Sequence, residues 1–220
     1  MGQIREDRSV TIKDLMVSIL IIAIIFSCCF NYYLYSNSFH KSLITQYSNN
    51  STLLEVDKNI TRYITGLDNT LDVPFNQKEQ SHMIDVKKLI IIEQVLTIIL
   101  LLSFLAICVT GQFEFFKHIK ISFFIMIIIL LMVLLMSRAF DFIFTVFHKI
   151  FFPQGNWQFP ADSLMIQTYQ EQFFERFTFQ IFLLSGIICT GFFILSEIIK
   201  NVILVRQPDN KDEEEKEKEE

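Results

Sequence analysis

The sequence is poor in glycine, proline and cysteine. Of its 220 residues, 6 are Gly, 4 are Pro and 4 are Cys, whereas 51% are hydrophobic. This composition excludes collagen-like, low-complexity and predominantly disordered chains. The cysteines, at positions 28, 29, 108 and 189, all lie in apolar stretches, where free cysteine behaves as a small apolar residue. Neither a disulfide framework nor metal-ligand spacing is indicated, and a thiol-oxidising enzyme with cysteines in its loops is excluded.

The sequence also lacks a dense cluster of Lys and Arg, so we expect no nucleic-acid partner. Its formal net charge of -5 arises at the C-terminus, where residues 209–220 hold eight acidic residues and three lysines. The rest of the chain is neutral. We therefore predict that the acidic tail is a solvated segment without chemistry of its own.

Four long apolar blocks dominate the sequence, at 15–35, 89–110, 121–140 and 177–196. Each has 20 to 22 residues, and a helix needs about 20 predominantly apolar residues to cross a bilayer. Four such blocks in one short chain predict an all-α membrane protein with four transmembrane helices.

The distribution of basic residues favours cytoplasmic termini. Segments 1–14, 111–120 and 197–220 together carry ten Lys and Arg in 48 residues, against eight in 89 for the other two loops. The loops at 36–88 and 141–176 are then extracytoplasmic. They are long enough to form a small cap, in which a short strand is possible at 42–47.

A polar stripe descends into the second apolar block. His82, Asp85 and Glu93 are spaced so that they share one face of a helix, with Glu93 about 16 Å deeper than His82. An ionisable side chain inside a membrane marks either a site or a buried structural pair, and Glu93 fits both interpretations.

A second stripe, formed by Arg138, Asp141 and His148, follows the third block. If the helix continues past the membrane surface, these residues also share one face. Each has an ordinary alternative role. A histidine at the membrane surface is often only a solvated aromatic side chain, and Arg138 with Asp141 can form a simple ion pair. Together, the two stripes predict that His82 and His148 converge near the outer surface. The remaining histidines, at positions 40 and 118, are predicted to be surface residues.

The segment 140–160 is unusually rich in phenylalanine for a solvated loop. Its simplest role is an interfacial wedge that holds the cap to the membrane, with turns supplied by Pro153, Gly155 and Pro160. A functional interpretation adds a docking surface for acyl chains.

Three passages resemble the lipoprotein intramolecular transacylase (Lit) family. They are Glu-Gln-Ser-His-Met-Ile-Asp-Val-Lys at 79–87, the stretch 138–152 with Arg138, Asp141 and His148, and Gly-Asn-Trp-Gln-Phe-Pro-Ala-Asp at 155–162. The resemblance runs from the first span to Phe174. It implies a bacterial four-span enzyme of the cytoplasmic membrane, found in Gram-positive bacteria, with its active site at the extracytoplasmic face.

The resemblance also implies a reaction and its residues. The acyl chain at the sn-2 position of an S-diacylglyceryl-cysteine lipoprotein would move to the α-amino group of the same cysteine, giving the lyso form. Diacylated lipoproteins and membrane lipid are then the partners, and no metal or other cofactor is expected. His82 and His148 would be the catalytic acid and base, in an order that the sequence leaves open. The supporting residues would be Asp85, Glu93, Arg138 and Asp141, and the substrate-binding residues Met83, Phe144, Phe147, Phe151 and Trp157.

Two other classes of function compete with this one. In the first, a non-enzymatic four-span protein binds lipid or a partner, and both histidines are structural. In the second, His82 and His148 are ligands of a haem or a metal ion. An acyl-histidine intermediate is a further alternative to direct transfer, and the sequence does not specify the oligomeric state.

Overall fold

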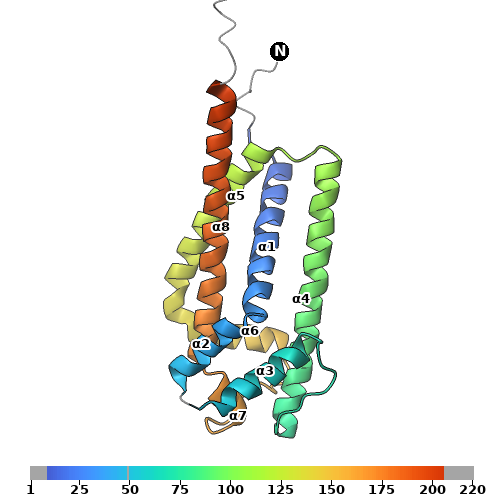
Figure 1. The fold of residues 1–220 in the computed structure, drawn as a ribbon, viewed down its shortest axis with the longest axis vertical. Coiled ribbons are helices and arrows are strands. Elements are labelled where there is room, and N and C mark those ends of the chain that lie inside the picture. Colours follow the sequence, from blue (N-terminus) through green and yellow to red (C-terminus); the bar gives the residue numbers. More distant parts are fainter. Residues whose placement is uncertain (1–8, 49, 206–220) are drawn as a thin grey trace, which may run out of the picture.

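The computed structural model describes residues 9–48 and 50–205, and these residues contain helices and turns but no strand. The helices are α1 (Ile12–Leu34), α2 (Asn37–Tyr47), α3 (Thr52–Ile64), α4 (Gln77–Val109), α5 (Phe115–Met136), the 3-10 turn η1 (Ser137–Ala139), α6 (Phe140–Phe151), α7 (Leu164–Thr168) and α8 (Glu171–Val205). Figure 1 shows a bundle of long helices with the short helices gathered at one end. The prediction of an all-α fold is confirmed.

Four helical stretches are long and apolar enough to cross a membrane, which confirms the four predicted spans. They contain α1, α4, α5 and α8. With 33 and 35 residues, α4 and α8 are about 50 Å long, whereas the hydrocarbon core of a bilayer is about 30 Å thick. Helix α4 begins twelve residues before the span predicted at 89–110. Helix α8 extends beyond both ends of the span predicted at 177–196. The acidic tail lies outside the described residues from position 206 onward.

Side-chain caps define where two of the long helices begin. Thr11 and Asp14 form a capping box at the start of α1, and Asn76 and Glu79 form another at the start of α4. In each box both residues satisfy backbone N–H groups that the first helical turn leaves without partners. The second box starts α4 twelve residues before the apolar block, and this places His82 on a rigid helix rather than in a loop.

Helix α1 is the centre of the bundle. It packs against α4, α5 and α8, and α5 also packs extensively against α8, whereas α4 packs mainly against α1 and, in the cap, against α3. The first described residues and the end of α8 lie at one end of the bundle, and the cap helices lie at the other (Figure 1). The outer sides of α4 and α5 are exposed apolar surface, as expected for helices that face lipid.

A buried polar cluster joins α1 to α5 at the terminal end of the bundle. His118 is 1% exposed, so the prediction that it is a surface residue is wrong. Its Nδ1 accepts a hydrogen bond from the Glu114 N–H (3.0 Å), and its Nε2 donates to Asp14 Oδ1 (3.2 Å). Lys117 Nζ lies 2.6 Å from the other oxygen of Asp14. Every nitrogen and oxygen of this His–Asp pair therefore has a partner.

The cap is built from α2, α3, α6 and α7, with no strand among its described residues. The possible strand at 42–47 is wrong, because these residues belong to α2. Ser36 starts this helix: its side chain accepts a hydrogen bond from the Phe39 N–H. His40, also predicted to be a surface residue, is only 5% exposed and donates through Nδ1 to Asp57 Oδ1 (2.8 Å).

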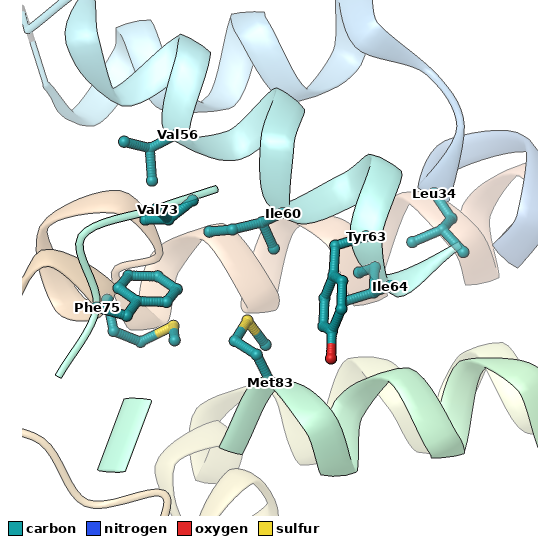
Figure 2. Packing of buried hydrophobic residues seen from close by; sticks show 9 residues of the cluster. Leu34, Val56, Ile60, Tyr63, Ile64, Val73, Phe75 and Met83 are labelled. Atoms are coloured by element: carbon teal, nitrogen blue, oxygen red, sulfur yellow. The ribbon is translucent and has the colours of Figure 1, made fainter. Parts of the chain in front are cut away.

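An apolar core fixes the cap to the outer part of α4. Its buried members come from α1, α3, α4, α7 and the connection before α4, and they are Leu34, Val56, Ile60, Tyr63, Ile64, Val73, Phe75, Met83 and Met165. Figure 2 shows Met83 reaching from α4 toward Ile60 of α3. Because tightly packed cores resist relative movement of their elements, α3 holds this part of α4 in place. The helix that carries His82 is therefore rigidly supported by the cap.

Candidate active site

His82 and His148 come together at the cap end of the bundle, as the two stripes predicted. Their ring centroids are 6.2 Å apart, and the ring planes are inclined by 24°. His82 belongs to the second turn of α4, which precedes the apolar block, and His148 belongs to α6. Both side chains are buried, with 7% and 8% exposure.

The position of His148 depends on a break between α5 and α6. The chain passes through the turn at 137–139, where Ala139 leaves helical geometry with φ -114° and ψ 25°. Figure 1 shows α6 running across the end of the bundle instead of continuing along α5. The chain beyond residue 140 is thus helical, as the second stripe requires, but the helix axis changes direction at the turn. This change of direction brings His148 to α4.

A backbone hydrogen bond determines the tautomer of His148. Its Nδ1 lies 2.7 Å from the carbonyl oxygen of Phe144, and because a carbonyl only accepts, Nδ1 carries the proton. In the neutral ring, Nε2 is then an unprotonated acceptor. His82 presents a similar feature: its Nδ1 is buried and has no hydrogen-bond partner among the described residues. Each ring thus carries one nitrogen without a protein donor.

Aromatic side chains enclose the histidine pair. Phe152 lies 4.5 Å from the ring of His82 and 5.5 Å from that of His148, measured between centroids. Phe159 covers His82 at 5.5 Å, while Phe144 and Trp157 cover His148 at 4.1 and 4.9 Å. This environment excludes water, and hydrogen bonds formed in such a site are stronger than in water. Sequence reasoning missed Phe152 and Phe159 as site residues, because they stand among many other phenylalanines.

Of the predicted substrate-binding residues, four lie on or near the histidine side of the cap. Phe144 and Trp157 contact His148 directly, and Phe147 contacts it at 5.4 Å. Phe147 and Phe151 are also 44% and 47% exposed, on a side of α6 that is suited to lipid or acyl chains. Met83 differs, because the structure places it in the apolar core between α3 and α4 (Figure 2).

Asp85 lies beside the site but binds the loop after α6 rather than an imidazole. Its Oδ2 accepts hydrogen bonds from Gln154 Nε2 (2.6 Å) and Asn156 Nδ2 (2.9 Å), and its Oδ1 accepts from Lys88 Nζ (2.9 Å). Gly155 allows this loop to turn, since its φ of 74° is a conformation that favours glycine. Asn156 was not predicted as a site residue, because an asparagine in a turn has no distinctive spacing.

Glu93 lies apart from the histidines and joins α4 to α1. Its carboxylate accepts hydrogen bonds from Ser27 Oγ, from Asn31 Nδ2 (3.0 and 3.1 Å) and from Thr97 Oγ1 (3.0 Å). Hydrogen bonds of this kind hold helices together where lipid removes the hydrophobic driving force. Of the two interpretations of Glu93, the structure supports helix association.

Arg138 and Asp141 do not form an ion pair in the part of the chain that the structure describes. Arg138 is exposed on the turn between α5 and α6. Asp141 lies close to Glu171, the first residue of α8. Neither side chain contacts a histidine of the pair. No group of three His, Cys, Asp or Glu side chains within 9–48 and 50–205 is arranged to hold a metal ion.

Comparison with known proteins identifies the family. The model of the family described as lipoprotein intramolecular transacylase Lit matches residues 10–174. The chain belongs to this family. It is therefore a transacylase, an enzyme of the acyltransferase class, and the family name gives lipoproteins as the substrate class.

Solved structures of this transacylase family have the same fold. The membrane-integral Lit of Bacillus cereus is 20% identical, covers 86% of this chain and 96% of its own, and has a TM-score of 0.69. A histidine-to-arginine mutant of the Bacillus cereus enzyme is 18% identical, covers 86% and 92%, and has a TM-score of 0.61. No curated protein matches the sequence.

Proposed function

We propose that this enzyme moves the sn-2 acyl chain of an S-diacylglyceryl-cysteine lipoprotein to the α-amino group of the same cysteine. The product is an N-acyl, S-monoacylglyceryl (lyso-form) lipoprotein. The observation that carries the proposal is the His82–His148 pair, in which two rings from different helices lie 6.2 Å apart in an apolar enclosure. Family membership supports the substrate class.

The reaction needs only proton transfers from the protein. The α-ammonium of the substrate, whose ordinary pKa is about 7.7 to 8.0, first loses a proton to an imidazole nitrogen. The amine then attacks the sn-2 ester carbonyl, a C–N bond forms, and the C–O bond to glycerol breaks. As the amide forms, the nitrogen loses a second proton, because the ammonium has three hydrogens and the amide nitrogen keeps one. One of the two protons passes through the imidazole to the glycerol oxygen and the other is released to solvent, so the enzyme ends in its starting protonation state.

The unpaired imidazole nitrogens suit this sequence of steps. In the neutral form, Nε2 of His148 is an acceptor, because its Nδ1 proton is held by the Phe144 carbonyl. A substrate ammonium can donate to it directly. Since donor and acceptor belong to one molecule, folding the amine onto the ester supplies effective molarities of roughly 10⁵ to 10⁸ M, and no acyl-carrying nucleophile is required.

The orientation of the enzyme is part of the proposal. The excess of Lys and Arg on the side of the termini supports a cytoplasmic location for that end, which places the cap and the histidines outside. A cysteine introduced by Lys58→Cys, on the exposed side of α3, should react with a membrane-impermeant maleimide in intact cells. Protection until the cells are lysed would reverse the orientation.

The test of the reaction is mass spectrometry of the N-terminal lipopeptide of a lipoprotein expressed with and without the enzyme. Fragment ions should show one acyl chain moved from glycerol to the amine at unchanged total mass. His82→Gln and His148→Gln should abolish this movement of the acyl chain. The control is His118→Gln, at the opposite end of the bundle: the fraction of this variant that folds should still transfer the acyl chain. Absence of movement with well-folded wild-type enzyme would refute the proposed reaction.

A further inference from the structure

The chain between α6 and α7, residues 153–163, forms a strap across the histidine pair. It contains turns and bends but neither helix nor strand. Two of its rings lie on the histidines: Phe159 is 5.5 Å from His82 and Trp157 is 4.9 Å from His148, measured between centroids. Most residues of the strap are nevertheless exposed. The strap is therefore a surface segment that covers the site.

Polar side chains on the outer part of α4 attach the strap to this helix. Asp85 Oδ2 accepts hydrogen bonds from Gln154 Nε2 (2.6 Å) and Asn156 Nδ2 (2.9 Å). Asn156 Nδ2 also donates to Ser81 Oγ (3.2 Å), and Lys78 Nζ donates to a backbone carbonyl of the strap (2.5 Å). Hydrogen bonds between charged and neutral groups are stronger than neutral ones. Asp85 is the residue of α4 that binds two side chains of the strap through its charge.

The two ends of the strap are anchored separately from its middle. Phe152, just before the strap, is 2% exposed, and its N–H donates to the carbonyl oxygen of His148 (2.8 Å). Just after the strap, Met165 belongs to the apolar core of the cap, and its N–H donates to Glu79 Oε1 (3.1 Å). Loss of the hydrogen bonds to Asp85 would therefore loosen the middle of the strap while its ends stay in place.

In this closed arrangement the histidine pair is not accessible to a substrate. Nδ1 of His82 is buried, and so is the side chain of His148, whereas the proposed reaction brings the amine of a lipoprotein to an imidazole nitrogen. Helix α4 is fixed by the apolar core of the cap, and α6 joins the bundle through the turn at 137–139. An exposed segment held by a few polar contacts opens at a lower cost in free energy than packed helices do. The strap is therefore the element that moves.

We propose that the strap opens to admit the lipoprotein and closes over it, and that Asp85 is the positioning residue that holds the strap closed. The inference rests on the proposed function of the histidine pair. A closed strap excludes water and keeps Trp157 and Phe159 against the two histidine rings while the acyl chain moves. Because Asp85 contacts the strap rather than an imidazole, it acts on the reaction through the strap.

The first test uses Trp157, the one tryptophan in the chain, as a reporter of the strap. In the purified full-length enzyme, acrylamide should quench the fluorescence of Asp85→Ala more steeply than that of wild type, because the released strap exposes the indole. Glu55→Ala, which removes an exposed carboxylate from α3, is the matched control and should be quenched like wild type. A purely structural Asp85 would lower the unfolding temperature but leave the quenching of the folded protein unchanged.

The second test fastens the strap to α4. Ser81→Cys with Asn156→Cys places two thiols where the wild-type side chains are hydrogen-bonded. A short bis-methanethiosulfonate reagent joins them, and a reductant releases them. Transfer of the acyl chain on a synthetic diacylated lipopeptide should be lost on cross-linking and recovered on reduction. The matched control is Glu55→Cys with Lys58→Cys, an exposed pair on α3, whose cross-link should leave transfer unchanged.

Two results would overturn the proposal. One is wild-type quenching of Trp157 in Asp85→Ala, which would show that Asp85 does not hold the strap. The other is undiminished transfer in enzyme whose strap is fully cross-linked, as measured by intact mass. The quenching measurement needs no turnover, so it separates failure of this inference from failure of the proposed reaction, which would appear as an inactive wild type.

Discussion

Two buried histidine clusters at opposite ends of the bundle use similar residues but differ in how completely their polar atoms are paired. In the terminal cluster, both nitrogens of His118 have partners, and Asp14 binds His118 and Lys117. In the cap cluster, Nδ1 of His82 is buried without a partner, and the one hydrogen bond of His148 within the described residues runs from its Nδ1 to the Phe144 carbonyl. Unpaired buried polar atoms cost free energy. His40 Nε2 and Thr61 Oγ1, elsewhere in the cap, are also buried without partners. The site therefore differs from a structural joint in having two histidine rings side by side, where the amine of a substrate could supply a donor.

The largest effect should come from His148→Phe. Phenylalanine keeps the ring packing against Phe144 and Trp157 but removes both nitrogens. The rate of acyl transfer should fall roughly 10² to 10⁴-fold, while the thermal unfolding temperature stays close to that of wild type. Activity is measured by lipopeptide mass spectrometry, and the fluorescence of Trp157, the one tryptophan in the chain, checks the packing. Retained activity would make the cap cluster structural, like the terminal one.

Asp14→Ala should sharpen the comparison from the other end. It leaves Lys117 and His118 without their acceptor and should destabilise the protein by about 2 to 3 kcal/mol, somewhat below the cost for a fully buried pair because Lys117 is partly exposed. The turnover of the protein that remains folded should be unchanged. Thermal unfolding in detergent measures the loss of stability. A pronounced loss of turnover at full stability would contradict a structural role.

Glu93 should behave as a joint between helices. Glu93→Leu leaves Ser27 and Asn31 without an acceptor and should weaken the packing of α4 on α1 by about 1 to 2 kcal/mol. Glu93→Gln, which keeps an acceptor oxygen, should recover most of this loss. Unfolding of both variants in detergent provides the measurement. If Glu93→Gln abolishes turnover while stability is kept, the charge of Glu93 takes part in the reaction.

The smallest effect concerns Tyr169, which joins α7 to α3 in the cap. Its hydroxyl donates to Asp57 Oδ1 (2.7 Å), and burial together with this carboxylate raises the pKa of Tyr169 well above its ordinary value. The unfolded chain then loses this proton near pH 10, while the folded cap keeps it, so stability falls as the pH rises above about 10. Tyr169→Phe should cost about 1 kcal/mol at neutral pH and remove this alkaline slope. An unchanged slope in pH-dependent unfolding would show that Tyr169 is not its source.

The features that depend on periodicity were predictable from the sequence. The apolar blocks predicted four spans, and the three- and four-residue steps predicted that His82 and His148 would meet. The side chains of Asn156, His40 and His118 could not be placed, because each is isolated in the sequence and acquires its partners only through tertiary packing. The strand expected at 42–47 failed because Ser36 caps a helix there, and propensity in a short segment is a weak guide.

The turn at 137–139 also has a consequence for the role of the bilayer. By redirecting α6, it gives one short helix two opposed surfaces, with the buried His148 on one and the exposed Phe142 and Ile150 on the other. Lipid in contact with the exposed surface then acts as part of the wall that supports the reaction centre. The composition and thickness of the surrounding membrane become structural variables of the enzyme, much as a subunit interface would be in a soluble one.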